Sequence, residues 1–115
     1  MIIKLMAKIC SVVAIALLVV AALGPANWAL RTALGWQIDH FLGYFAITSI
    51  VCIAWSRPFV FGGVLMAIAA LLEGLQALTA DRLSNLLAAT CGASGALTAA
   101  LLAELFIRAR RRPAR

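Results

Sequence analysis

A few ionisable and hydrogen-bonding side chains interrupt a chain that is otherwise almost entirely apolar. The residues that could do chemistry are Asp39, His40, Glu73, Gln76, Arg82 and Asn85. Carboxylates and imidazole exchange protons, while amides and a guanidinium can hold a polar ligand. A carboxylate near the centre of a membrane helix costs about 2.5–3.5 kcal/mol on insertion scales. Groups that cost this much are expected to have a partner or a function.

The composition predicts an integral membrane protein. Apolar residues make up 65% of the 115 residues and charged residues only 12%, against about 45–50% and about 25% in soluble proteins. Burial in lipid accommodates this apolar surface, and the length suits a few helices of about 20 residues each. We therefore expect an all-α integral membrane four-helix bundle, with residues 1–115 forming one transmembrane domain.

Four apolar runs define the expected helices. They cover residues 5–23, 39–55, 59–78 and 83–107. Gly24 and Pro25 end the first run, because proline cannot continue a helix comfortably. A secretory signal peptide is the alternative for this run. A retained helix is favoured, because the run is long for a signal core and the remaining chain would still need the membrane.

The basic residues predict the orientation, because four spans put both termini on the same side. Lys4, Lys8, Arg57 and the five arginines of residues 108–115 then share one side, and Arg31 and Arg82 the other. The positive-inside rule makes the first side cytoplasmic, with residues 108–115 as a basic cytoplasmic tail. Because this tail directly follows an apolar run, membrane lipids are its expected partner and nucleic acid is not.

Small residues recur every four positions in the last run, at Ala88, Gly92, Ala96 and Ala100. On a helix they share one face and let another backbone approach closely. Contacts within the bundle are the expected use of this face, and contact with a partner protein is the alternative.

The three cysteines, Cys10, Cys52 and Cys91, all lie inside apolar runs. They are far apart in the sequence and show no metal-ligand spacing, so we interpret them as small buried hydrophobic residues. No metal and no cofactor is expected.

The predicted orientation brings the polar residues to one depth. Asp39 and His40 open the second helix, Glu73 and Gln76 close the third, and Asn85 lies near the start of the fourth. One interpretation is a structural lock: Arg82 bridges Glu73 or Asp39, Gln76 and Asn85 tie helix ends together, and Asp81 or Ser84 caps the fourth helix. The other is a binding site for a headgroup or envelope molecule. Catalysis is less favoured, because no nucleophile, base and orienting group can be identified.

At these positions the chain resembles VanZ-like membrane proteins. Asp39-His40-Phe41, with Tyr44-Phe45 following, is similar to the first signature of that family. The second block of the family, E-x-x-Q followed by R-L-S-D-x-x-x-N-x-x-G, resembles Glu73 and Gln76 followed by Arg82-Leu83-Ser84 and Gly92. The resemblance covers roughly residues 24–100. The chain departs from the pattern at Asn85 and Ala89, where the family has aspartate and asparagine, and Ala80-Asp81 replaces the usual Pro-Gly.

The resemblance implies a small multi-pass protein of the bacterial cell inner membrane with a role in the cell envelope. We expect an extracytoplasmic polar cluster that binds or shields an envelope precursor, with consequences for glycopeptide susceptibility. The alternative is a non-catalytic accessory subunit that packs against a larger membrane-protein partner through the small-residue face.

Overall fold

The computed structural model describes residues 1–28, 31–79 and 85–114, and these residues are helical apart from short connections. The elements are α1 (Ile2–Leu23), the short 3-10 helix η1 (Ala26–Trp28), α2 (Trp36–Ala54), α3 (Pro58–Gln76) and α4 (Leu86–Arg111). All four α-helices are long and apolar enough to cross a membrane. The prediction of an all-α, multi-span protein is therefore confirmed.

The helix ends differ from the apolar runs by a few residues. Gly35, with a φ of 100°, lies immediately before α2, which begins at Trp36 rather than at Asp39. Asn85 caps α4 by accepting a hydrogen bond from the Leu87 N–H at 2.9 Å. At its other end α4 continues to Arg111, so the first four residues of the predicted tail, 108–111, are helical. Basic side chains in a last turn suit the negative end of the helix dipole, which hydropathy does not register.

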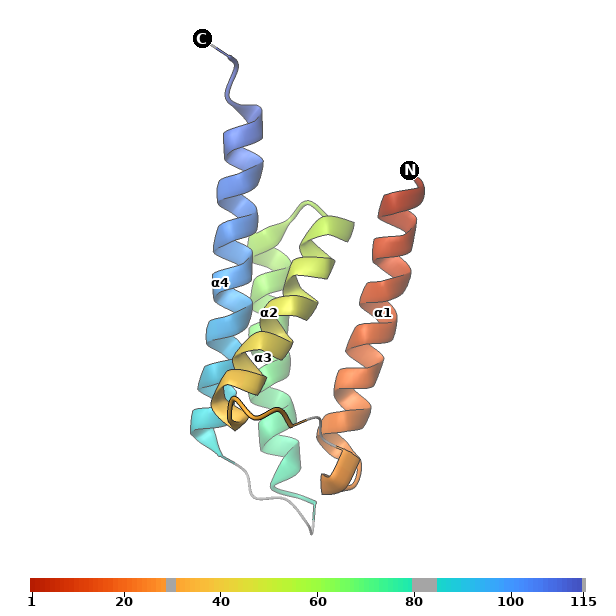
Figure 1. Ribbon diagram of the computed structural model, residues 1–115, viewed down its shortest axis with the longest axis vertical. Coiled ribbons are helices and arrows are strands. Elements are labelled where there is room, and N and C mark those ends of the chain that lie inside the picture. Colours follow the sequence, from red (N-terminus) through yellow and green to blue (C-terminus); the bar gives the residue numbers. More distant parts are fainter. Residues whose placement is uncertain (29–30, 80–84, 115) are drawn as a thin grey trace.

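Three helices form the compact part of the bundle. α4 packs extensively on both α2 and α3, whereas α1 packs on α2 and α3 and makes no contact with α4 within the described residues. Figure 1 shows α1 standing apart from α4. Ser11 is the one buried residue of α1 among those described. The exposed surface of α1 consists mostly of apolar side chains. That surface suits lipid, as expected for a membrane-spanning helix.

Both chain termini lie at one end of the bundle, together with the connection between α2 and α3 (Figure 1). The last turns of α1 and α3 and the first turns of α2 and α4 lie at the opposite end (Figure 1). This arrangement is the one that four successive spans require.

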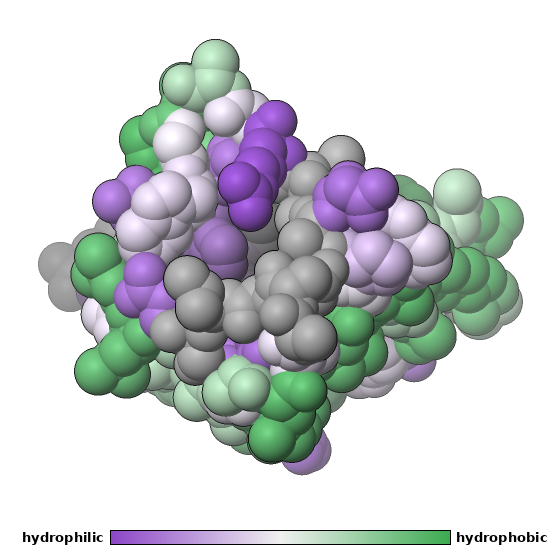
Figure 2. Space-filling view, turned by 90° about the horizontal axis from the view of Figure 1, so that it is seen from below, coloured by the Kyte–Doolittle hydropathy of each residue, from purple (hydrophilic) through white to green (hydrophobic). Residues whose placement is uncertain are grey.

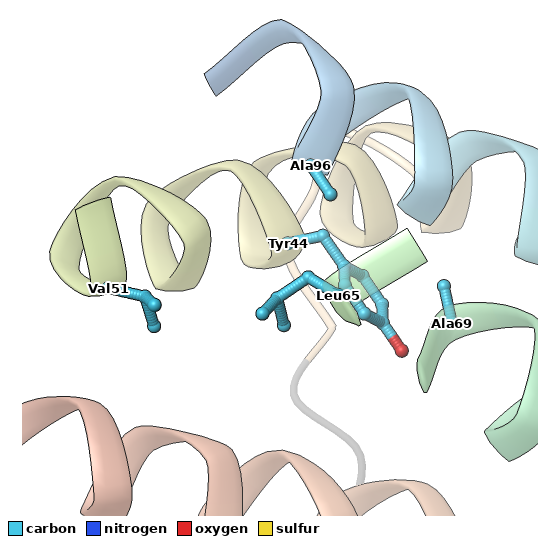
Figure 3. Packing of buried hydrophobic residues seen from close by; sticks show 5 residues of the cluster. All are labelled: Tyr44, Val51, Leu65, Ala69 and Ala96. Carbon is cyan, nitrogen blue, oxygen red and sulfur yellow. The ribbon is translucent and has the colours of Figure 1, made fainter. Parts of the chain in front are cut away.

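The centre of the bundle is built from side chains of α2, α3 and α4. Its buried cluster consists of Tyr44, Val51, Leu65, Ala69 and Ala96, and in Figure 3 the ring of Tyr44 lies beside Leu65. Small residues on α4 make this packing close. A Cβ added at Gly92 would lie 2.7 Å from a ring carbon of Tyr44, and one at Gly95 would collide with the backbone carbonyl of Phe41.

Candidate functional site

A pocket of about 360 Å³ lies between α1, α2 and α3 near the end of the bundle opposite the termini. We name it the polar pocket, and its polar lining residues are Asp39, His40, Tyr44, Glu73 and Gln76. Small and aliphatic residues form the rest of the lining: Ala14, Leu17, Leu18, Ala21, Ala22, Gly43, Ile47, Ala69, Leu72 and Ala88. Figure 2 views this end and shows hydrophilic residues gathered on it, with hydrophobic residues over much of the surrounding surface.

Glu73 lies in the last turn of α3 and is only 7% exposed. Its Oε1 accepts a hydrogen bond from the backbone N–H of Asn85, the residue that caps α4. The first N–H groups of a helix have no partner within the helix, and a carboxylate beside them also suits the helix dipole. Glu73 therefore connects the end of α3 to the start of α4 while lining the polar pocket.

Gln76 connects α3 to α1. Its Nε2 donates a hydrogen bond to the backbone carbonyl of Ala22 at 2.9 Å. Ala22 belongs to the last turn of α1, where carbonyls lack partners within the helix. Because α1 has few buried residues, this hydrogen bond is a specific attachment between α1 and the compact part of the bundle.

Asp39 is held from the connection that precedes α2. Its carboxylate accepts hydrogen bonds from the hydroxyl of Thr32 and, at 2.9 Å, from the Thr32 backbone N–H. Thr32 was not among the residues expected at the site. It lies in a short irregular segment, and no periodicity predicts that it faces a residue seven positions later.

His40 presents one ring nitrogen to its own helix. Nδ1 lies 2.8 Å from the Trp36 carbonyl oxygen, which can only accept, so Nδ1 is the donor in this hydrogen bond. The Trp36 ring contacts the imidazole edge-on, with ring centroids 6.1 Å apart. In the neutral ring Nε2 then has a lone pair, and no described residue donates to it. His40 can therefore accept a hydrogen bond or a proton from a ligand.

The structure brings together four of the six residues expected at the site, namely Asp39, His40, Glu73 and Gln76. Asn85 does not line the pocket, but it is hydrogen-bonded to Glu73. Arg82, with the alternative caps Asp81 and Ser84, lies outside the described residues. Of the residues described, no lysine or arginine lines the pocket, so this part of the site favours ligand groups that donate hydrogen bonds.

The small residues of α4 face the inside of the bundle. Ala88, Gly92, Ala96 and Ala100 are all buried. Gly92 lies against Tyr44 of α2 and Ala69 of α3, and Ala100 lies against Gly62 of α3. This face is covered within the chain, so a partner protein would have to bind elsewhere.

The described residues offer little for metal or thiol chemistry. Across residues 1–28, 31–79 and 85–114, no three His, Cys, Asp or Glu side chains lie close enough to hold a metal ion. Cys10, Cys52 and Cys91 are unpaired, and of these Cys52 is buried while Cys10 is exposed. The polar pocket is the site with the most varied chemistry.

No family model, no curated protein and no solved structure matches this chain.

Proposed function

We propose that the chain is a VanZ-like protein of the bacterial inner membrane, whose polar pocket binds an amphiphilic component of the cell envelope. The observation that carries this proposal is the convergence of Asp39 and His40 from α2 with Glu73 and Gln76 from α3 on one pocket. These four residues also belong to the two sequence blocks that resemble the family.

The lining of the polar pocket suggests the chemistry of the ligand. Carboxylate oxygens and the Nε2 of His40 accept hydrogen bonds, so the polar part of the ligand carries hydroxyl or amine donors. Leu17 and Leu18 of α1 supply an apolar wall against which a hydrocarbon segment can lie. A lipid or a lipid-linked precursor combines these two properties, whereas a small polar solute has only the first.

The charge distribution supports the orientation. Lys4 lies near the start of α1, Arg57 directly before α3, and three arginines in the last turn of α4. These element ends share the end of the bundle that carries both termini (Figure 1). A cytoplasmic location for that end follows from the positive-inside rule. The polar pocket then opens near the extracytoplasmic face, where cell-envelope components are exposed to it.

Two glycine substitutions test the proposal. Gly43 lines the polar pocket and Gly63 does not, yet at both positions an added Cβ has no neighbour within 4 Å. Gly43→Leu should therefore fill the pocket without breaking the fold, and Gly63→Leu is the matched control. Each variant is purified from native membranes, and the molecules that copurify are identified by mass spectrometry.

An envelope amphiphile should copurify with the wild type and with Gly63→Leu, and it should be depleted from Gly43→Leu. Glu73→Gln, which keeps a hydrogen-bond acceptor toward Asn85, should also bind less of this molecule, whereas Glu104→Gln at the other end should not. Equal recovery from the two glycine variants, or no envelope molecule in any sample, would leave the polar residues with a structural role alone. In a deletion strain, Gly63→Leu but not Gly43→Leu should restore wild-type glycopeptide susceptibility.

A further inference from the structure

A second cavity, of about 710 Å³, lies near the end of the bundle that carries the termini. It exists because α1 and α4 both pack on α2 but do not contact each other in the described part of the chain. The α2 surface between them, including Ser49 and Ile53, is therefore left open. We name this cavity the basic groove, because Lys4 of α1 and Arg110 and Arg111 of α4 line it.

The positive charge of the basic groove is uncompensated by the described residues. Arg108 pairs at 2.7 Å with Glu104, one helical turn earlier, and neither of them lines the groove. No described carboxylate pairs with Lys4, Arg110 or Arg111. Three cationic side chains from two helices therefore line one open cavity.

The wall of the basic groove is apolar. Leu102, Phe106 and Ile107 of α4 contribute to it, and the Arg110 guanidinium lies 4.5 Å from the centre of the Phe106 ring. This cation–π contact holds the charge of Arg110 beside the apolar wall. The groove thus combines cations with a hydrocarbon surface on helices long enough to cross a membrane.

We propose that the basic groove binds one anionic phospholipid, with its phosphate at Lys4, Arg110 and Arg111 and an acyl chain along α4. Guanidinium groups match phosphate oxygens with two parallel hydrogen bonds, and basic pockets between membrane helices bind anionic headgroups. The apolar wall favours a lipid over free phosphate, because phosphate alone would leave that wall uncovered. This inference does not depend on what the polar pocket binds.

The test compares two double variants that remove equal charge from the same end of the bundle. Arg110→Gln with Arg111→Gln removes groove cations, and Arg57→Gln with Arg112→Gln removes exposed cations that do not line it. Purified proteins are titrated in detergent with phosphatidylglycerol, with phosphatidylcholine of the same acyl chains, and with inorganic phosphate. Binding is measured by native mass spectrometry.

The wild type should bind one phosphatidylglycerol in preference to phosphatidylcholine, and inorganic phosphate should not displace it at equal concentration. The groove variant should bind phosphatidylglycerol about tenfold more weakly or worse, and the control variant within about twofold of wild type. Lys4→Gln alone should also weaken the binding of phosphatidylglycerol. This second variant keeps the test valid even if the double arginine variant fails to fold. Equal loss in both double variants, equal binding of the two lipids, or displacement by phosphate would overturn the proposal.

Discussion

The carboxylate of Glu73 accepts a hydrogen bond from the backbone N–H of Asn85, so a side chain near the end of one helix binds the cap of the next. The same carboxylate lines the polar pocket. A structural lock and a binding site were alternative interpretations of the sequence, but at this residue they are compatible. A group fixed by a helix end is already oriented for a ligand.

Replacing Glu73 with alanine should lower the free energy of unfolding by about 1–2 kcal/mol, because the Asn85 N–H loses a charge-assisted partner. Glu73→Gln should cost less, since an amide oxygen can still accept. Unfolding in detergent, followed by circular dichroism, measures both. Glu104→Ala is the control, and its loss should stay below about 1 kcal/mol because the side chain of its partner, Arg108, is 67% exposed. If Glu73→Ala and Glu104→Ala lower the free energy of unfolding equally, the stabilising role of Glu73 is contradicted.

Gln76→Leu should loosen the end of α1, because the Ala22 carbonyl loses its donor. Hydrogen exchange of the last turn of α1 should then become faster, while exchange in α4 should not change. Gln37→Leu is the matched control, since Gln37 is exposed and makes no side-chain hydrogen bond within the described residues. Unchanged exchange in the Gln76 variant would show that packing alone holds α1.

Gly95→Ala should destabilise the bundle by about 1–3 kcal/mol, the usual cost of overpacking. The added methyl group would meet the Phe41 backbone, which cannot move as a flexible side chain can. Gly63→Ala should instead stabilise by about 0.5–1 kcal/mol, because the new methyl group meets nothing and alanine favours the helix. Opposite signs for these two substitutions in thermal unfolding are the expected result. If Gly95→Ala does not destabilise the protein, then α2 and α4 lie farther apart than this structure shows.

Thr48→Val should leave the stability unchanged or raise it by about 1 kcal/mol. The Thr48 hydroxyl is fully buried and has no hydrogen-bond partner in the described structure, so an equally shaped apolar side chain removes an unsatisfied group. Thr48→Ala should be destabilising, because it leaves a cavity. If Thr48→Val lowers the free energy of unfolding as much as Thr48→Ala does, the Thr48 hydroxyl has a hydrogen-bond partner in the protein in solution.

Single cysteines should establish the sidedness of the bundle. Asn27 is exposed at the end of the bundle that carries the polar pocket, and Ser56 is exposed between α2 and α3. With the native cysteines replaced, Asn27→Cys should react with a membrane-impermeant maleimide in spheroplasts, and Ser56→Cys only in inverted vesicles. The reverse pattern would place the polar pocket on the cytoplasmic side.

The sequence determined the features that depend on local composition. Length and hydropathy predict four helices, because each apolar run covers a membrane thickness by itself. The i, i+4 spacing from Ala88 to Ala100 predicts a face for close packing, and the same spacing suits the ion pair that Glu104 and Arg108 form. Alternating spans also put the residues of the polar pocket at one end before any contact is known.

Only the tertiary structure decided which of these residues meet. The partner of Gln76 is a backbone carbonyl 54 residues away, and backbone acceptors carry no mark in a sequence. Thr32 faces Asp39 through an irregular connection, whose path no periodicity encodes. The position of α1, in contact with α2 and α3 but not with α4 among the described residues, creates both the polar pocket and the basic groove. Hydropathy makes a helix enter the membrane, but the side of the bundle on which it packs depends on the shapes and polar groups of several helices together.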